Sequence, residues 1–210
     1  MNKVVSKEFF SENVFRLEVE APRIAKSRRA GHFVILRVDE KGERIPLTIA
    51  SSDPEKGTIT LVIQRVGVST RKLSELEPGD SVLDLVGPLG QATDVKKVGT
   101  VLACAGGVGV APMLPIVEAH KKAGNKVISI IAARSKDLII LEDQIREHSD
   151  ELIVMTDDGS YGKKGLITEG MEEVIAREQV DEAVIIGPAV MMKFAAPSRY
   201  CNVAARTTRC

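Results

Sequence analysis

The chain has 210 residues, of which 44% are hydrophobic and 28% are charged, a composition typical of globular proteins that bury a sizeable core. Lysine and arginine together number 29, as do aspartate and glutamate, so the formal net charge is zero at pH 7. Because no basic cluster recurs, charge gives no reason to propose nucleic acid or an anionic membrane surface as a partner. The length suits one large domain or two of about 100 residues each.

The cysteines and the first residues of the chain indicate a compartment. The opening twenty residues carry scattered charges and no apolar stretch typical of a secretory signal. The cysteines are odd in number and widely spaced, at Cys104, Cys201 and Cys210. This spacing argues against a disulfide framework and predicts a cytoplasmic location. Cys104 is expected to be a small core residue, and no pair among the isolated histidines has the spacing of metal ligands.

Up to about residue 96 the pattern is that of short strands. Residues 13–22 alternate between polar and apolar, residues 31–40 are half apolar, and residues 57–66 are rich in β-branched side chains. Turn signals separate these stretches, and one short helical stretch follows at 69–76. The pattern predicts a small antiparallel β-barrel over residues 1–96.

Two features of this first half are receptive to an anion. The sequence ERIPLTIAS, residues 43–51, sets an arginine beside a proline-stiffened strand and a hydroxyl group. The sequence QRVGVSTRKLSEL, residues 64–76, sets a glycine and two hydroxyl residues at the start of a helix. The alternative for the first is an exposed arginine at a strand end, and for the second a pair of helix caps. Both alternatives stay open at this point.

After residue 97 strands alternate with helices. Strand-like runs at 99–106, 126–133, 151–156 and 181–187 alternate with helical stretches at 111–124, 135–148 and 165–179. Such alternation predicts βαβ units and a parallel sheet covered on both faces, in an α/β domain over residues 97–194. One mixed α+β domain is the alternative, and the change of period favours two domains.

Residues 98–117 form a run of twenty residues without a charge, long enough to span a membrane. The run contains four glycines and two prolines, which in a helix interior cost about 1 and about 3 kcal/mol each relative to alanine. We therefore predict no membrane span but a buried strand, a glycine turn, and a helix that begins at Ala111 and Pro112. Such a helix start binds a diphosphate. Alternatively, the glycines only permit tight packing of strand on helix.

This loop departs from the standard dinucleotide fingerprint, because Pro112 stands where the third glycine is expected. The next strand ends in Arg134 and Ser135 rather than in an acidic residue that would hold a ribose 2′-hydroxyl. An arginine there suits a 2′-phosphate, which favours NADP(H) over NAD(H) and leaves the preference open. Residues 194–210 contain three arginines, no acidic residue and no clear period, so the helix expected after Lys193 is predicted to dissolve.

With GPLG (87–90), AGGVGVAPMLP (105–115), TDDGSYGKKG (156–165) and GPAVMMK (187–193), these motifs resemble the ferredoxin–NADP reductase superfamily. The resemblance covers about residues 1–194. Within the superfamily, the chain most resembles the alpha (small) subunit of NADH-dependent ferredoxin:NADP oxidoreductase, an enzyme also called sulfide dehydrogenase. The electron-transfer subunit of dihydroorotate dehydrogenase B is a near relative of that branch.

The resemblance implies a flavoprotein that passes electrons between NAD(P)H and an iron–sulfur centre through FAD. The FAD contacts it implies are Arg44, Pro46, Leu47, Thr48, Ile63, Gln64, Val66, Gly67, Ser69 and Thr70, with Thr48 near flavin N5. The nicotinamide nucleotide contacts it implies are Gly106, Gly107, Val108, Gly109, Ala111, Pro112, Arg134, Ser135, Gly187, Pro188, Met191 and Met192. Asp157 is implied to lie near this cofactor without a metal. Hydride transfer takes place between the cofactors, so no catalytic side chain is expected.

The resemblance also implies partners: a large glutamate synthase-like subunit with flavin and iron–sulfur groups, in a heterodimer, and ferredoxin or a similar carrier. The alternatives are the electron-transfer subunit of dihydroorotate dehydrogenase B and a non-catalytic cofactor-binding fragment. The chain departs from the superfamily pattern at Arg44, which lies one residue farther from its threonine, and at Leu47, which replaces an aromatic residue. Relatives continue into a cysteine-rich segment that ligates a [2Fe–2S] cluster. Cys201 and Cys210 cannot supply its four ligands, so residues 195–210 are interpreted as an atypical, truncated or frameshifted tail.

Overall fold

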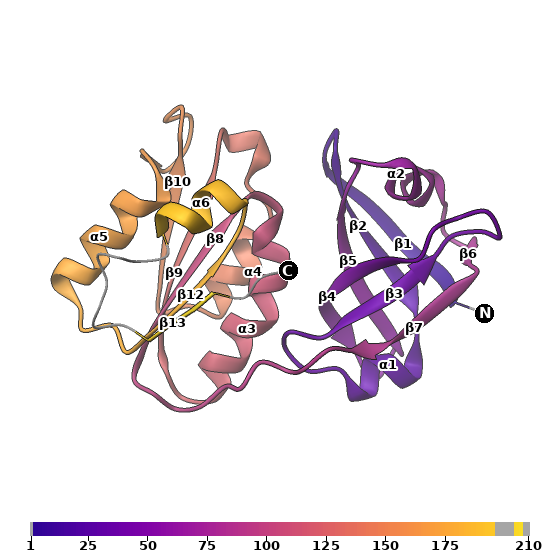
Figure 1. The fold of residues 1–210 in the computed structure, drawn as a ribbon, viewed down its shortest axis with the longest axis horizontal. Helices are drawn as coiled ribbons and strands as arrows, with labels where there is room; N and C mark the ends of the chain where they lie inside the picture. The colour runs from indigo at the N-terminus through magenta and orange to yellow at the C-terminus, as the bar shows by residue number, and fades with distance from the viewer. Residues whose placement is uncertain (1, 196–203, 208–210) are drawn as a thin grey trace. The chain divides into compact units, whose positions relative to one another are not determined.

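The computed structural model of the protein describes residues 2–195 and 204–207. The chain forms two compact units, Met1–Thr93 and Asp94–Cys210 (Figure 1). No helix within the described ranges is long and apolar enough to cross a membrane. The uncharged run at 98–117 instead contributes a strand, a glycine turn and the first part of a helix.

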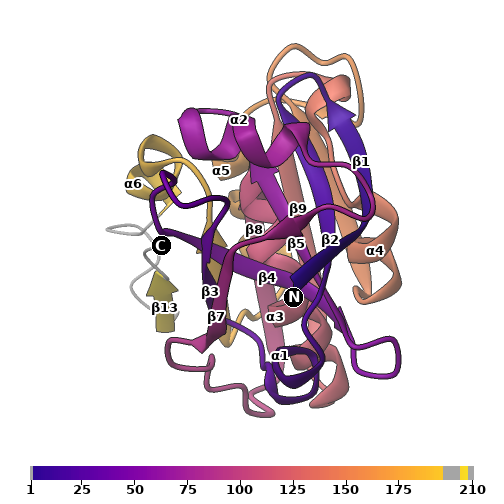
Figure 2. The same ribbon diagram turned by 90° about the vertical axis from the view of Figure 1, so that its right-hand side faces the viewer.

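The first unit is a strongly curled antiparallel sheet. Its strands are β1 (Asn2–Ser11), β2 (Val14–Glu20), β3 (Phe33–Arg37), β4 (Ile45–Asp53), β5 (Thr58–Gln64), β6 (Ser81–Val82) and β7 (Asp84–Leu89), and its helices are α1 (Pro22–Ser27) and α2 (Val68–Glu75). The strand order is β6-β1-β2-β5-β4-β3-β7. Because β6 and β7 follow each other in the chain yet stand at the two ends of this order, the sheet closes nearly into a barrel. Figure 2 shows α1 and α2 at opposite ends of it.

The barrel core follows from the alternation of apolar residues along paired strands. In the antiparallel register of β2 and β5, Phe15 lies opposite Ile63 and Leu17 lies opposite Leu61. All four side chains are at most 2% exposed, because paired residues point to the same side of a sheet. Each such side chain contributes about 1.5–3 kcal/mol through the hydrophobic effect. The antiparallel barrel predicted from the sequence is thereby confirmed.

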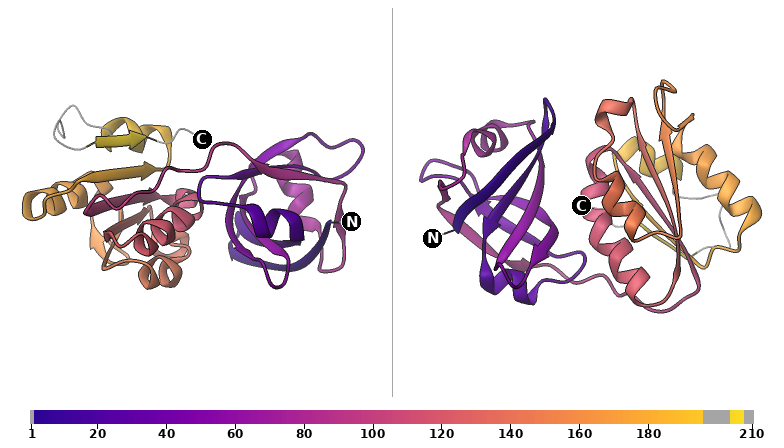
Figure 3. Two further views of the ribbon diagram at one scale, coloured as in Figure 1. Left: turned by 90° about the horizontal axis from the view of Figure 1, so that it is seen from below. Right: turned by 180° about the vertical axis from the view of Figure 1, so that it is seen from behind.

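The second unit is a parallel sheet between two layers of helices. Its strands are β8 (Thr100–Gly106), β9 (Lys126–Ala133), β10 (Glu151–Thr156), β11 (Lys163–Lys164), β12 (Glu182–Ile186) and β13 (Ala204–Thr207). Its helices are α3 (Val110–Lys122), α4 (Glu142–Glu147), α5 (Ile167–Arg177) and α6 (Ala189–Ala195), with short 3₁₀ turns η1 (Gly107–Gly109) and η2 (Lys136–Leu138). The strand order is β11-β10-β9-β8-β12-β13. Helices α3 and α4 cover one face, and α5 and α6 cover the other (Figure 3). The predicted βαβ alternation is confirmed.

The structure corrects three details of the sequence prediction. The helix predicted at 135–148 is broken into η2 and α4, because Leu141 adopts a left-handed conformation with φ 56°. The sequence places the last helix after the GPAVMMK motif, whereas α6 lies largely within this motif; residues 196–203, over which the helix is predicted to dissolve, lie outside the described residues. Strand β13, which the sequence did not predict, pairs in parallel with β12. Cys201 and Cys210, on which the cluster argument rested, lie outside the described residues.

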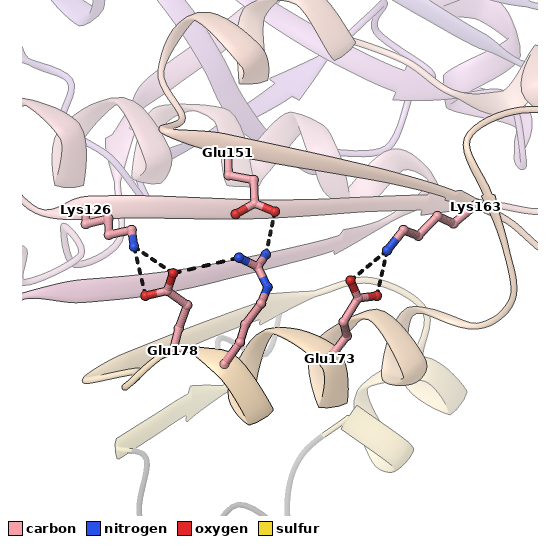
Figure 4. Close-up of polar contacts among 6 residues, drawn as sticks. Lys126, Glu151, Lys163, Glu173 and Glu178 are labelled. Atoms are coloured by element: carbon pink, nitrogen blue, oxygen red, sulfur yellow. Dashed lines mark hydrogen bonds and ion pairs between the residues drawn. The ribbon is translucent and has the colours of Figure 1, made fainter.

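Ion pairs attach α5 to the strands beneath it (Figure 4). The Lys126 ammonium lies 2.8 Å from Glu178, and the Arg177 guanidinium lies 2.5 Å from Glu151. About one turn earlier in the helix, Lys163 on β11 lies 2.6 Å from Glu173. These hydrogen bonds hold the pKa of Glu178 and of Glu173 below its ordinary value. The groups are partly exposed, so each pair adds only modestly to the free energy of unfolding.

Cys104 lies in the middle of β8 with no exposed surface. Burial raises the pKa of its thiol far above the ordinary value, so the thiol stays protonated and unreactive. The prediction of a small core residue is confirmed.

Candidate functional site

The outer face of β4 carries two of the predicted flavin contacts. In the register of β3 and β4, Leu47 lies opposite the fully buried Val34 and packs against the barrel core. Since side chains alternate along a strand, Pro46 and Thr48 lie on the opposite, outer surface. Pro46 is exposed and Thr48 is half-buried. The structure thus offers Pro46 and Thr48 to a ligand outside the barrel and directs the Leu47 side chain inward.

Arg44 lies directly before β4 in a small charge cluster. Its guanidinium donates to the Asp84 carboxylate at 2.9 Å, and Arg37 Nε lies 3.2 Å from the same oxygen. Two guanidinium groups share one carboxylate, so the cluster retains a positive charge beside the exposed Pro46. A positive charge at this place suits a bound anion. Sequence reasoning missed Asp84, because the residue enters from β7 and no local pattern marks it.

The turn from β5 to α2 presents an open backbone. The Ile63 side chain is 2% exposed and belongs to the barrel core, whereas Gln64 is exposed. Val66 and Val68 are 70% and 75% exposed, which is unusual for side chains of this size. A Cβ atom on Gly67, which lies between them, would meet nothing within 4 Å. The backbone at Gly67 therefore stands in open space at the start of α2.

Thr70 shapes this turn with its side chain. Its hydroxyl accepts hydrogen bonds from the backbone nitrogens of Gly67 at 3.0 Å and Val66 at 3.1 Å, and it donates to the Gly67 carbonyl at 3.1 Å. Ser69, the other predicted contact here, is buried at 8% exposure. The first backbone N–H groups of a helix have no partner within the helix and attract anions. Since Ser69 is buried and the Thr70 hydroxyl is hydrogen-bonded to the turn, the backbone of this turn remains available to an anion. The hydrogen bonds of Thr70 hold that backbone in place.

In the second unit, the strand order reverses between β8 and β12. The chain moves from β8 outward to β9 and β10, and then returns to place β12 on the other side of β8. Ile186 at the end of β12 lies beside Ala105 at the end of β8. Ligands of parallel α/β sheets bind at such a switch point, outside the carboxyl ends of the strands. Gly106 ends β8, Gly107 to Gly109 follow it, and Gly187 and Pro188 follow β12, so the topology brings these predicted residues together.

The glycines of the first loop have different tasks. Gly107 has φ 55°, and a Cβ atom there would meet nothing within 4 Å. A Cβ atom on Gly109 would lie 2.6 Å from the Ile186 carbonyl oxygen, so this glycine permits close packing of the α3 start on β12. A Cβ atom on Gly106 would collide with Met191. The packing interpretation therefore applies to Gly106 and Gly109. Gly107 faces open space, and the binding of a diphosphate at this loop stays a prediction.

The start of α3 agrees with its prediction to within a residue. The helix begins at Val110, with the buried Ala111 and the half-buried Pro112 in its first turn. The fixed φ of proline suits this turn, where backbone N–H groups lack partners within the helix. Val108 is half-buried within η1. The loop and the first turn of α3 thus lie beside the switch point, directly after the end of β8.

The residues predicted for the adenosine side lie where β9 and β10 end. Arg134 is exposed and Ser135 is half-buried. The loop after β10 is hydrogen-bonded to them: Asp158 donates its backbone N–H to the Arg134 carbonyl at 3.2 Å, and Ser160 accepts from the Lys136 backbone at 2.9 Å. Ser160 also donates to the Asp158 carboxylate, which lowers the pKa of that carboxyl. Arg134 and the TDDG loop therefore form one surface.

Asp157 lies in this loop and is exposed, with its backbone N–H donated to the Ala133 carbonyl at 3.1 Å. Within the described ranges, no group of three or more histidine, cysteine, aspartate or glutamate side chains could hold a metal ion. The loop geometry supports the prediction of a place near the cofactor, which itself stays a prediction.

A near-closed antiparallel barrel followed by a parallel sheet with an open glycine at its switch point defines a flavin- and nicotinamide-dependent oxidoreductase. Comparison with known proteins agrees for each unit. Residues 2–93 match the oxidoreductase FAD-binding domain, and residues 104–196 match the oxidoreductase NAD-binding domain. The chain belongs to the ferredoxin–NADP reductase superfamily, within the family that includes the electron transfer subunits of dihydroorotate dehydrogenase B.

Three relatives show the extent of this similarity. A dihydroorotate dehydrogenase B electron transfer subunit homolog from Thermotoga maritima is 43% identical over 92% of this chain and 68% of its own length. The corresponding subunit from Desulforamulus reducens is 32% identical over 91% of this chain and 74% of its own. A solved structure of an NADH-dependent reduced ferredoxin–NADP oxidoreductase has a TM-score of 0.94 at 40% identity, covering 100% of this chain and 76% of the other. FAD and a nicotinamide dinucleotide are thus the cofactors of this chain.

Proposed function

We propose that the chain binds FAD on the outer face of β4 and at the start of α2. We further propose that it binds NAD(P)(H) at the carboxyl ends of β8 and β12, and that it catalyses hydride transfer between the two cofactors. One observation carries the proposal. Each unit places a glycine at the start of a helix, Gly67 before α2 and Gly107 before α3, and a Cβ atom on either would meet nothing within 4 Å. Open backbone at a helix N-terminus is what a diphosphate requires.

The chemistry of the reaction belongs to the cofactors, which when bound supply hydride transfer and the release of single electrons. The residues of this chain bind and orient them. Arg44, with the positive charge of its cluster, stabilises the FAD diphosphate, and the backbone of Gly67 lets it approach. Pro46 and Thr48 would give the flavin a partly apolar surface to bind, outside the barrel. Such positioning accounts for several kcal/mol of a hydride-transfer barrier, in line with the effect of orienting two reactants.

The electron acceptor in this proposal is an iron–sulfur partner, held by a larger subunit. A glutamate synthase-like large subunit is the first candidate, since a relative of similar fold is an NADH-dependent reduced ferredoxin–NADP oxidoreductase. The dehydrogenase subunit of dihydroorotate dehydrogenase B is the second candidate, since two relatives are named as the electron transfer subunit of that enzyme or its homolog. The proposal also includes a reducing, cytoplasmic compartment, on the ground of the odd number and wide spacing of the cysteines.

A visible spectrum of the purified chain, reconstituted with FAD, tests the proposal. The expected result is a yellow protein with flavin absorption bands that bleach under anaerobic conditions when NADH or NADPH is added. A protein that takes up no FAD would remove the barrel site from the proposal. Retention of FAD without bleaching by either nucleotide would remove the site at β8 and β12. Co-purification with a tagged large subunit of each type distinguishes the two candidate partners.

A further inference from the structure

Met191 on α6 fills the space above two glycines of the nucleotide-binding unit. The side chain is half-buried and packs against the core of this unit. Of the atoms near the Cβ position of Gly106, its sulfur is the nearest and lies closer than any Cβ atom could tolerate. At the Cβ position of Gly187, Met191 Cε lies 2.6 Å away and the sulfur 2.9 Å away. One side chain thus occupies the space that both glycines leave.

The two glycines belong to the two sides of the switch point. Gly106 is the last residue of β8, and Gly187 follows the last residue of β12. A third contact joins the same segments, because the Cβ position of Gly109 lies 2.6 Å from the Ile186 carbonyl oxygen and 3.1 Å from the Gly187 Cα. We call Met191 together with Gly106, Gly109 and Gly187 the methionine wedge. It fixes the β8–α3 loop against the β12–α6 turn.

Gly107 lies between two members of the wedge and is itself open on its Cβ side. Close-packed contacts resist small displacements, because protein interiors have the density of organic crystals. Gly106 and Gly109, which flank Gly107 in the loop, are thus held in place. A loop that is packed on both sides of Gly107 loses less conformational freedom when a ligand binds, which lowers the ordering cost of binding.

We propose that Met191 is a positioning residue for the dinucleotide: it does not read the nucleotide but sets the spacing of the two backbone segments that do. Deleting the Met191 side chain leaves the loop free to move, so nucleotide affinity falls while the chemistry of bound cofactors is little affected. That the ligand is a nicotinamide dinucleotide rests on the proposed function, whereas the packing of Met191 against the glycines does not depend on it.

A mutant cycle measured by thermal unfolding without cofactor tests the packing. Gly106→Ala is expected to lower the unfolding midpoint by roughly 2–4 °C, because the new methyl group displaces the flexible end of the Met191 side chain from its place in the core. In the Met191→Ala background the same substitution is expected to cost less than half of that shift. Gly107→Ala is the matched control: its cost arises from a positive φ, so Met191→Ala does not relieve it. Equal shifts for Gly106→Ala in both backgrounds would overturn the wedge.

Steady-state turnover of the FAD-loaded protein with NADH or NADPH, and with an artificial one-electron acceptor such as ferricyanide, tests the positioning role. Met191→Ala is expected to raise KM about tenfold and to change kcat less than twofold, while Met191→Leu restores most of the affinity. Two controls isolate the effect: Val190→Ala, on the same helix but 69% exposed, and Met171→Ala, in the same core but on α5. Neither is expected to raise KM more than twofold.

The outcomes separate this inference from the proposed function. If Met191→Ala keeps the KM of the parent protein, or if Met171→Ala raises KM as much, Met191 has no positioning role, although the proposed function stands. If the parent protein binds neither nucleotide, the proposed function fails and this role fails with it, although the unfolding cycle still reports the packing.

Discussion

The Arg44 guanidinium donates to the Asp84 carboxylate at 2.9 Å, although forty residues separate the two in the chain. The pair lies on the outer face of the barrel, where Arg37 approaches the same carboxylate. Asp84 therefore limits the positive charge that the cluster offers to an anion. Removing the charge of Arg44 makes the cluster less positive, whereas removing the charge of Asp84 makes it more positive. The two substitutions therefore test the role of Arg44.

We expect Arg44→Ala to raise the Kd for FAD about tenfold, which corresponds to about 1.4 kcal/mol, because a charged partner of the diphosphate is lost. Asp84→Asn is expected to lower the Kd two- to threefold, since both guanidinium groups then face the ligand. Fluorescence titration of the apoprotein with FAD at low salt measures both. Lys56→Ala, which removes an exposed ion pair with Asp53, serves as the control. Weaker binding in both variants of the pair would show that the cluster supports the fold and not the ligand.

Gly67→Ala separates binding from stability. Gly67 has φ −138°, which alanine adopts without strain, and its Cβ position is open. The unfolding midpoint is therefore expected to change by less than about 2 °C, the shift that follows from a small free-energy change. The added methyl group stands where the diphosphate approaches, so the Kd for FAD is expected to rise at least tenfold. Unchanged FAD affinity would place the diphosphate elsewhere.

Arg134 is expected to discriminate between the nicotinamide nucleotides. Arg134→Ala should raise the KM for NADPH about tenfold, because a charge-assisted contact to a 2′-phosphate is lost, and leave the KM for NADH within twofold. Steady-state oxidation of NADPH and of NADH with an artificial one-electron acceptor measures both KM values. Arg146→Ala, which removes an exposed guanidinium on α4, should change neither value. If Arg134→Ala leaves the ratio of the two values unaltered, the 2′-phosphate assignment is wrong.

The ion pairs of α5 predict a pH dependence of stability. Hydrogen bonds from Lys163 and Lys126 lower the pKa of Glu173 and Glu178 from the ordinary 4.5. A carboxyl group whose pKa is lower in the folded protein stabilises it above the unfolded pKa, and this contribution is lost as the pH falls through the folded value. We expect the unfolding midpoint to decline below about pH 4.5, where the unfolded chain binds more of these protons.

Glu173→Gln and Glu178→Gln should each flatten this decline between pH 5 and pH 3 and change the midpoint little at low pH. Urea unfolding at fixed temperature across this range measures the effect. Glu147→Gln, at an exposed position at the end of α4, is the control. If the two variants follow the pH profile of the parent protein, the ion pairs of α5 contribute nothing to its acid sensitivity.

The sequence predicted those features that depend on local periodicity. Alternating residues such as Leu17 predicted the barrel strands, and the charge-free glycine run predicted the turn between β8 and α3. Strand register was beyond prediction, because the position of Leu47 opposite Val34 is set by pairing between distant segments. The sequence accordingly grouped Leu47 with Pro46 as flavin contacts, whereas the structure places their side chains on opposite faces of β4.

The separate tasks of the glycines were also beyond prediction. Gly106, Gly107 and Gly109 are equivalent as letters, and only the atoms around their Cβ positions distinguish them. Those atoms belong to Ile186 and Met191, some eighty residues farther along the chain. The break at Leu141 was also beyond prediction. A left-handed conformation is rare for a residue other than glycine, and no local sequence pattern indicates it here.

The position of β12 in its sheet has a consequence for the order in which the protein is made. One edge of β8 is covered only by β12, which is synthesised after β9, β10 and the helices between them. Until β12 emerges from the ribosome, that apolar edge has no strand to pair with, and unpaired edges of this kind promote association with other chains. The nucleotide site and the protection of β8 are thus completed in the same late step, so a nascent chain that stalls before Glu182 would be both inactive and prone to aggregate.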